Sequence, residues 1–237
     1  MKSKVITLIF LMSFFDLKSQ SNNTTFGLQY KPIIPAKYFN SSHIQKNSDN
    51  YFFNLNPEYS NSFGMIIRQK LNNTFSIESG LNYIQRNYTL TINHDKDNVS
   101  FSDLTKFGMR SYEIPIQILT YVQISKFWYL NVAFGISHNV LASNILSYGE
   151  NTNSYFQNTD RRQGGYEALL ANIGIEYRTE KKRNYYIGTS LHRPWKSIGK
   201  IYPQYDDNIN IFNKNEDFFL EMLGNFITID FRYFFAE

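Results

Sequence analysis

The residues Asn225 to Phe235, N-F-I-T-I-D-F-R-Y-F-F, decide the fold of this 237-residue chain. Side chains of two kinds alternate along this stretch, which is the period of a β-strand whose two faces meet different surroundings. The apolar and aromatic face carries Ile227, Ile229, Phe231, Tyr233 and Phe235. The opposite face carries Thr228, Asp230, Arg232 and then Phe234. We therefore predict a strand that turns its apolar face to lipid and its charged face to the inside of a closed barrel.

The composition agrees with a barrel and excludes a bundle of membrane helices. Aromatic residues make up 17% of the chain, charged residues 19%, and the mean hydropathy is −0.40. A barrel strand places half of its residues on a polar interior, so its average hydropathy resembles that of a soluble protein. No apolar run after Phe15 reaches the length that a membrane helix needs. The chain has no cysteine, which excludes disulfides and a lipid-modified cysteine at the mature N-terminus.

The N-terminus is typical of a secretory signal peptide. Lys2 and Lys4 precede an apolar run from Val5 to Phe15, and a small polar stretch around Ser19 and Gln20 follows. We predict a signal peptide over residues 1–19 and one barrel domain over residues 20–237; a short buried helix is the alternative for the apolar run. Removing three lysines (2, 4 and 18) and one aspartate (16) changes the formal net charge from +4 to +2. A nearly neutral mature chain argues against a nucleic-acid partner.

Alternation continues along the whole mature chain and predicts eight strands. We place them at residues 24–31, 57–71, 74–91, 110–124, 127–140, 166–179, 184–194 and 218–235. Short turns at Asn72–Asn73, Ser125–Lys126 and Glu180–Arg183 alternate with four long polar connections, which include 93–108, 143–165 and 195–217. The fold class we predict is all-β: an eight-stranded antiparallel up-and-down transmembrane β-barrel with short periplasmic turns and four longer extracellular loops. Such a protein belongs in the bacterial outer membrane.

A soluble up-and-down barrel of the lipocalin type is the alternative fold. Its interior would be the apolar face of each strand. Here the face opposite the apolar one carries charges, for example Arg68 and Glu78. The membrane barrel is therefore favoured.

The sequence resembles the small outer-membrane β-barrel proteins of the Bacteroidota that are often labelled PorT-like. The resemblance is carried by the signal ending near Ser19–Gln20, F-G-M-I-I-R-Q-K-L at 63–71, S-I-E-S-G-L-N-Y at 76–83, Y-E-I-P-I-Q-I at 112–118 and the terminal F-I-T-I-D-F-R-Y-F-F. It implies a barrel whose last strand is read by the barrel assembly machinery, and an accessory role in secretion or cell-surface machinery. Ala236 and Glu237 follow the terminal aromatic residue, which departs from the family's pattern.

Charged residues on the inward faces are the main candidate site. We predict a lumen charge network of Arg68, Glu78, Glu113, Glu176, Arg178, Asp230 and Arg232. Lys31 and Lys70 share the same faces. An eight-stranded barrel is just wide enough for its side chains to fill it, so charges inside it must pair. We expect Glu113, Glu176, Arg232 and Arg68 to pair across the lumen; the alternative is a conducting or proton-relaying path.

Other chemistry has weaker support in the sequence. Ser190 and His192 share one strand face, with Asp206–Asp207 in the following loop, so a hydrolase at the extracellular rim is one hypothesis. The four histidines are not closely spaced. Loose calcium binding is one interpretation of Asp95, Asp97 and Asp103, but we expect them to lie in a solvated loop. We expect no catalytic residue, no metal and no cofactor.

The sequence therefore predicts a non-enzymatic outer-membrane barrel with a structural or interaction role. The alternative is an adhesion or ligand-binding barrel that acts through its extracellular loops. Loop aromatic residues such as Tyr148, Tyr155 and Tyr202 are adhesive contacts under that alternative, or they pack over the barrel mouth. The expected partners are outer-membrane lipid, the barrel assembly machinery through the C-terminal strand, and protein partners in the cell envelope.

Overall fold

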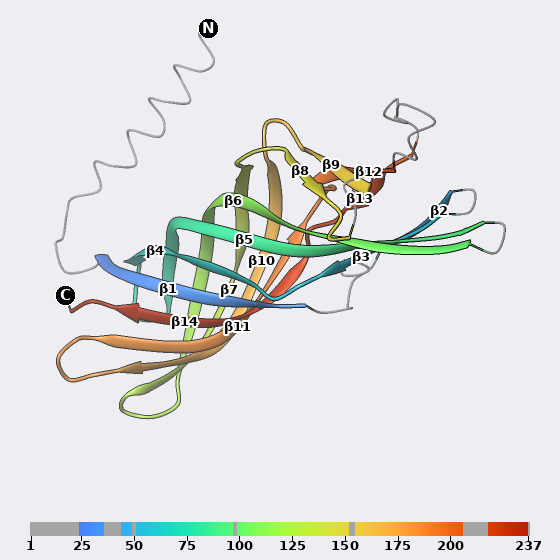
Figure 1. Cartoon of the computed structure of the whole chain (residues 1–237). Helices are drawn as coiled ribbons and strands as arrows, with labels where there is room; N and C mark the ends of the chain where they lie inside the picture. The colour runs from blue at the N-terminus through green and yellow to red at the C-terminus, as the bar shows by residue number, and fades with distance from the viewer. Residues whose placement is uncertain are drawn as a thin grey trace, which may run out of the picture.

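A closed ring of eight antiparallel strands forms the body of the protein. The computed structural model describes residues 24–35, 44–48, 51–96, 99–151, 155–205 and 218–236, so the predicted signal peptide and Asp206–Asp207 lie outside the described residues. The ring strands are β1 (Thr24–Ile34), β4 (Ser60–Lys70), β5 (Phe75–Lys96), β6 (Val99–Gln123), β7 (Trp128–Leu141), β10 (Tyr166–Arg178), β11 (Asn184–Pro194) and β14 (Phe226–Phe234). Each ring strand pairs with the ring strand that follows it in the sequence, and the β1–β14 pairing closes the ring (Figure 1). The predicted eight-stranded barrel is confirmed.

The two faces of each ring strand divide as the alternation predicts. Outward side chains are apolar and exposed, as at Phe134 (62% exposed) and Ile116 (56%). Inward side chains of the same strands, such as Asn131 on β7 and Gln117 on β6, are buried. Outward apolar surface in the middle of a barrel is stable where it contacts lipid, which is the arrangement of an outer-membrane protein.

Aromatic residues form two rows on the lipid-facing surface. Near the short turns, in-register neighbours on four strands form one row: Trp128, Tyr177, Tyr185 and Tyr233. Toward the long connections, four neighbours on the other strands form a second row: Tyr30, Phe63, Tyr83 and Tyr112. Ring centroids within the rows lie close, for example 4.9 Å for Trp128 and Tyr177 and 5.1 Å for Phe63 and Tyr83. Rows of aromatic residues on the outer surface are typical of membrane barrels, in which such residues gather at the interfaces.

The long connections are not plain loops, and this corrects the prediction. Residues 93–108 were expected to be a polar loop, but β5 and β6 run on as a hairpin, with Lys96 opposite Val99. Strands β2 (Ile44–Ser48) and β3 (Tyr51–Pro57) add to the edge of β5. The connections at 143–165 and 195–217 contain strands too: β8 (Ile145–Tyr148), β9 (Tyr155–Arg161) and β12 (Gly199–Tyr205) join β13 (Leu220–Met222) in a separate four-stranded sheet.

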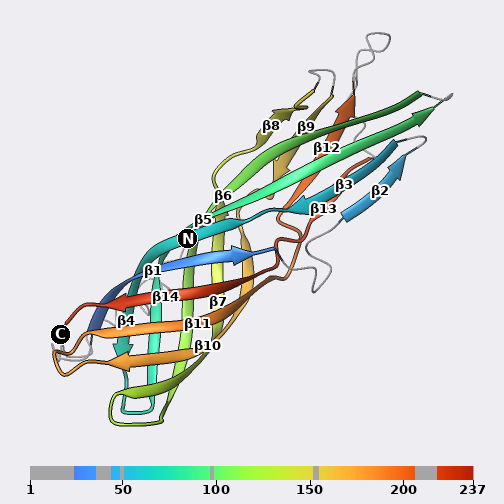
Figure 2. The ribbon, with the colours of Figure 1, turned by 60° about the horizontal axis from the view of Figure 1, so that its bottom comes forward.

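These extra strands and the outer parts of β5 and β6 form what we call the head, which lies at one end of the barrel (Figure 2). A hydrophobic core lies within the head and is shared by the two sheets; it continues to the ring strands β7 and β10 through Leu141, Tyr166 and Ala168. Its buried members include Phe53, Leu55, Leu90, Ile92, Phe107, Tyr155, Ile198, Ile201 and Leu220. The segments looked like loops because the added strands are short and buried positions of the β6 extension carry polar residues such as Asp103 and Thr105, so no segment alone shows a strong hydrophobic period.

Two strand boundaries also differ from expectation. The last strand does not start at Phe218, because Gly224 has φ 70° and separates β13 from β14. A positive φ is costly for residues with a Cβ, so glycine suits this break. At the other end of the ring, Pro32 does not end β1, which continues to Ile34 with Pro32 opposite Asn61. Across the described ranges, no helix has the length and apolar character needed to cross a membrane.

Candidate functional site: the charged lumen

Arg68 on β4 is the centre of an ion-pair network inside the barrel. Its Nε donates to Glu78 Oε1 at 2.7 Å, and its Nη1 donates to Glu176 Oε2 at 2.6 Å. Glu78 lies on the neighbouring strand β5, in register with Arg68, whereas Glu176 comes from β10 on the opposite side of the ring. Arg68 is 4% exposed, so this cation and its partners are held in the interior.

Two further arginines extend the network on either side. Arg232 Nη1 donates to Glu78 Oε2 at 2.9 Å, and its Nη2 donates to Asp230 Oδ2 at 2.8 Å. Arg178 Nε donates to Glu176 Oε1 at 2.7 Å. Charges of opposite sign therefore alternate along one connected chain: Arg178, Glu176, Arg68, Glu78, Arg232 and Asp230. Six of the seven residues predicted for the lumen lie in it, and their formal charges cancel.

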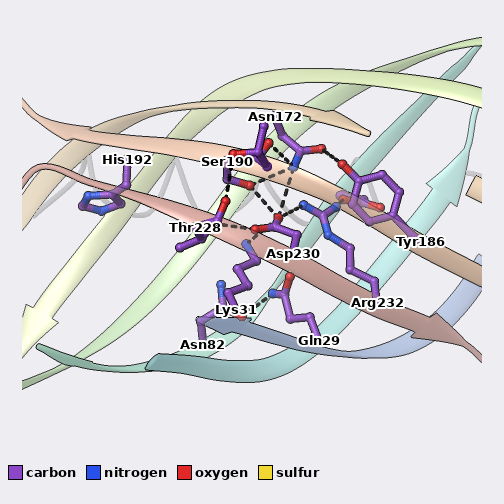
Figure 3. A network of polar contacts seen from close by, with 12 residues as sticks. Gln29, Lys31, Asn82, Asn172, Tyr186, Ser190, His192, Thr228, Asp230 and Arg232 are labelled. Carbon is purple, nitrogen blue, oxygen red and sulfur yellow. Dashed lines mark hydrogen bonds and ion pairs between the residues drawn. The ribbon is translucent and has the colours of Figure 1, made fainter. Parts of the chain in front are cut away.

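The Asp230 carboxylate has the densest set of donors. Ser190 Oγ, Thr228 Oγ1 and Asn172 Nδ2 donate to it in addition to Arg232 (Figure 3). Lys31 Nζ lies 3.7 Å from Asp230 Oδ2 and supplies a second cation. A buried carboxylate with this many partners stays ionised and fixed in place, because each donor stabilises its charged form.

Glu113 lies outside this network. Its Oε2 accepts from Asn82 Nδ2 at 2.8 Å, and Asn82 in turn accepts a hydrogen bond from Gln29. Its Oε1 lies 3.4 Å from His192 Nε2, without hydrogen-bond geometry. The expected pairing of Glu113 with an arginine across the lumen is not what the structure contains. The reason is position: Glu113 is in register with Asn82, four residues along β5 from Glu78 toward the head.

Arg86 is an inward charge that our sequence reasoning missed. It occupies the lumen beneath the head, where its Nη2 donates to Ser111 Oγ at 3.2 Å and also to the Tyr166 hydroxyl. Its guanidinium lies 5.3 Å from the Phe226 ring centroid. The sequence did contain a signal for this position, because Arg86 lies on the same face of β5 as Glu78 and Asn82. Arg86 fills the passage between the charge network and the head.

Aromatic rings cover the guanidinium groups of the network. Arg68 lies 3.8 Å from the Phe234 ring centroid, and Arg178 lies 3.9 Å from that of Tyr129. Arg232 lies 4.6 Å from the Tyr186 ring centroid, and the Tyr186 hydroxyl donates to Asn172. These contacts, which attract cations to the ring faces, leave the arginines little freedom to move.

Ser190 and His192, the two residues of the rim-hydrolase hypothesis, have different neighbours in the structure. Ser190 donates to Asp230, and both His192 ring nitrogens lack a hydrogen-bond partner within the described chain. His192 stacks on Phe226 at a centroid distance of 4.2 Å and stands apart from the hydrogen-bonded cluster in Figure 3. No hydrogen bond joins Ser190 to His192 among the described residues. The described ranges also contain no group of three or more His, Cys, Asp or Glu side chains that could hold a metal.

The architecture and the site together define a class of protein. A small closed barrel with an apolar outer band, rows of outward aromatic residues and a charged interior is a bacterial outer-membrane β-barrel protein. The family model described as outer membrane protein beta-barrel domain matches residues 19–234. The chain therefore belongs to that family.

Solved structures agree at the level of the fold. The chain is similar to the outer membrane protein OprG from Pseudomonas aeruginosa, with a TM-score of 0.52 and 8% identity, over 91% of this chain and 97% of that one. A second likeness, to the outer membrane protease OmpT from Escherichia coli, has a TM-score of 0.30 and 9% identity over 90% and 91% of the two chains. No curated protein matches the sequence.

Proposed function

We propose that this protein is a non-enzymatic outer-membrane barrel that holds its head outside the cell as an interaction surface. The observation that carries the proposal is the hydrophobic core of the head, which joins residues of β3, β5, β6, β9, β12 and β13. For a barrel that served only as an anchor, short connections at both ends would be enough. Here β5 and β6, at 22 and 25 residues, are far longer than the 9–11 residues that cross a bilayer.

The charge network supports a closed barrel rather than a transport path. Each carboxylate of the network contacts two cations, and the guanidinium groups are covered by aromatic rings. An ion crossing the lumen would have to break several buried ion pairs, each costly to separate in a medium of low dielectric constant. We infer that the lumen stabilises the barrel and that binding takes place on the head.

The surface of the head offers contacts for a partner. Leu146 and Tyr148 on β8 are more than half exposed, and Tyr148 packs beside Phe156 on β9 at a centroid distance of 6.0 Å. Exposed aromatic side chains of this kind are frequent in protein–protein contacts. The PorT-like resemblance extends this proposal to an accessory role in secretion or cell-surface machinery, with a protein partner in the envelope.

Site-specific photocrosslinking in intact cells tests the proposal. A photoreactive residue at Tyr148 should give discrete protein adducts. The same residue at Phe134, which faces lipid, or at Asn73 in a periplasmic turn is the matched control and should give none. Adducts at Asn73 with none at Tyr148 would move the interaction to the periplasmic side and contradict the proposal.

A further inference from the structure

A cavity opens at the end of the barrel opposite the head and is separate from the surface proposed for partners. It has a volume of about 260 Å³ and lies between the turn that joins β4 to β5 and the turn that joins β10 to β11. Four cationic side chains line it: Arg68, Lys70, Arg178 and Lys182. The remaining lining residues are neutral, and no carboxylate lines the cavity within the described chain.

The charge balance leaves this cavity positive. Arg68 and Arg178 are neutralised by Glu78 and Glu176, which lie deeper in the lumen. Lys70 and Lys182 are exposed and have no ion-pair partner among the described residues. Two formal positive charges therefore face the cavity without compensation, in a recess whose walls limit solvent screening.

Hydrogen-bond donors also point to an anionic ligand. Arg178 uses its Nε on Glu176, and its guanidinium plane is fixed between the rings of Tyr121 and Tyr129, at 4.7 Å and 3.9 Å from their centroids. Its two terminal nitrogens make no hydrogen bond to the described chain. The Tyr121 hydroxyl is buried at the cavity and also lacks a hydrogen-bond partner within the described residues. A rigid guanidinium beside mobile ammonium groups is the donor set that proteins use for phosphate.

We propose that this cavity binds a phosphate-type oxyanion that enters from the periplasm. Its volume lies below the range of about 300–1,000 Å³ that is typical for drug-sized ligands, which favours a small anion. The chemistry fits free phosphate, a soluble phosphate monoester, or the phosphate of an inner-leaflet lipid headgroup that reaches the barrel mouth. The proposal is independent of the role assigned to the head.

Calorimetric titration of inorganic phosphate into the full-length protein tests the proposal. The protein is held in a maltoside detergent, which contains no phosphate. The double variant Lys70→Gln/Lys182→Gln should weaken phosphate binding about tenfold or more, since it removes both uncompensated charges. The matched control Lys126→Gln/Lys181→Gln removes two exposed lysines at the same end that do not line the cavity, and its affinity should stay within about twofold of wild type.

A second titration, in maltoside micelles with and without added phosphatidylglycerol, identifies the source of the anion. Unchanged phosphate affinity assigns the cavity to a soluble anion, and weaker affinity with phosphatidylglycerol assigns it to a lipid headgroup that competes. Absence of phosphate binding by wild type at millimolar concentration would overturn the proposal. An equal loss in the two double variants would overturn it as well. Each variant is folded if its unboiled and boiled samples differ in gel mobility as those of wild type do.

Discussion

Arg68 on β4 and Glu176 on β10 meet across the full width of the barrel, with Arg68 Nη1 2.6 Å from Glu176 Oε2. Their strands are four positions apart in a ring of eight, so the pair joins directly opposite walls. Arg68 also binds Glu78 on the adjacent strand, which ties the cross-lumen contact to the sheet itself. The lumen is therefore held from wall to wall by side chains rather than left as a pore.

Replacing Arg68 with methionine tests the strength of this contact. The change leaves Glu78 and Glu176 buried with one cationic partner fewer each, so the free energy of unfolding should fall by about 3–5 kcal/mol. Urea unfolding in micelles, followed by tryptophan fluorescence, measures the loss. Lys126→Met is the control, because the Lys126–Glu180 pair is exposed and its loss should cost less than about 1 kcal/mol. An Arg68→Met barrel as stable as wild type would show that the network contributes nothing.

Leu90→Ala tests whether the head has a packed core. Leu90 is fully buried in the hydrophobic cluster of the head, and a large-to-small change there should cost about 2–5 kcal/mol. Amide hydrogen exchange should accelerate in β9 and β12, while the ring strands below the head keep their protection. Phe134→Ala, on the lipid-facing surface, should leave exchange in the head unchanged. Equal exchange in Leu90→Ala and wild type would contradict a packed head.

Tyr155→Phe tests the buried tyrosine of the head at high pH. Burial raises the pKa of the Tyr155 hydroxyl, and the nearby Asp103 carboxylate raises that pKa further. Above about pH 10 the unfolded chain loses this proton while the folded head retains it, so stability falls as pH rises. The phenylalanine variant should lose less stability between pH 9 and pH 11 than wild type. At neutral pH it should match wild type or exceed it by about 1 kcal/mol, since the buried hydroxyl lacks a hydrogen-bond partner within the described chain. Parallel pH profiles of the two proteins would refute this reasoning.

Lys182→Gly tests why a lysine occupies its position in the β10–β11 turn. Lys182 has φ 60°, a conformation that costs about 1–2 kcal/mol for a residue with a Cβ and almost nothing for glycine. The substitution should raise the unfolding free energy by up to about 1 kcal/mol and weaken phosphate binding at the same time. Lys181→Gly should produce neither effect. A Lys182→Gly protein with full phosphate affinity would remove this lysine from the anion site.

The sequence predicted the ring and missed the head, and the reason is physical. Along Trp128 to Val140 one face meets lipid and the other meets a polar lumen, so apolar and polar residues alternate clearly. In the β6 extension, the buried residues Asp103, Thr105 and Phe107 include two polar ones, so the stretch resembles a loop. The signal of the head core is divided among parts of six strands, β3, β5, β6, β9, β12 and β13, and becomes visible when the chain folds.

The same limit applies to the charge network. Alternation assigns Arg68, Glu78 and Arg232 to the lumen, because it fixes which face of a strand each residue occupies. It does not fix how high each residue sits in the barrel, since this height depends on the stagger between neighbouring strands. Glu113 was therefore grouped with residues on another level, where Asn82 and His192 are its neighbours.

Planar-bilayer recording of the purified wild-type protein in 1 M KCl tests the central claim, that the lumen is closed. Lipid insertion should be verified in the same membranes by protease protection of the barrel. The account predicts no discrete conductance steps from inserted protein. Steady, ion-selective openings from wild type would contradict the closed lumen and return the charge network to the role of a conduction path.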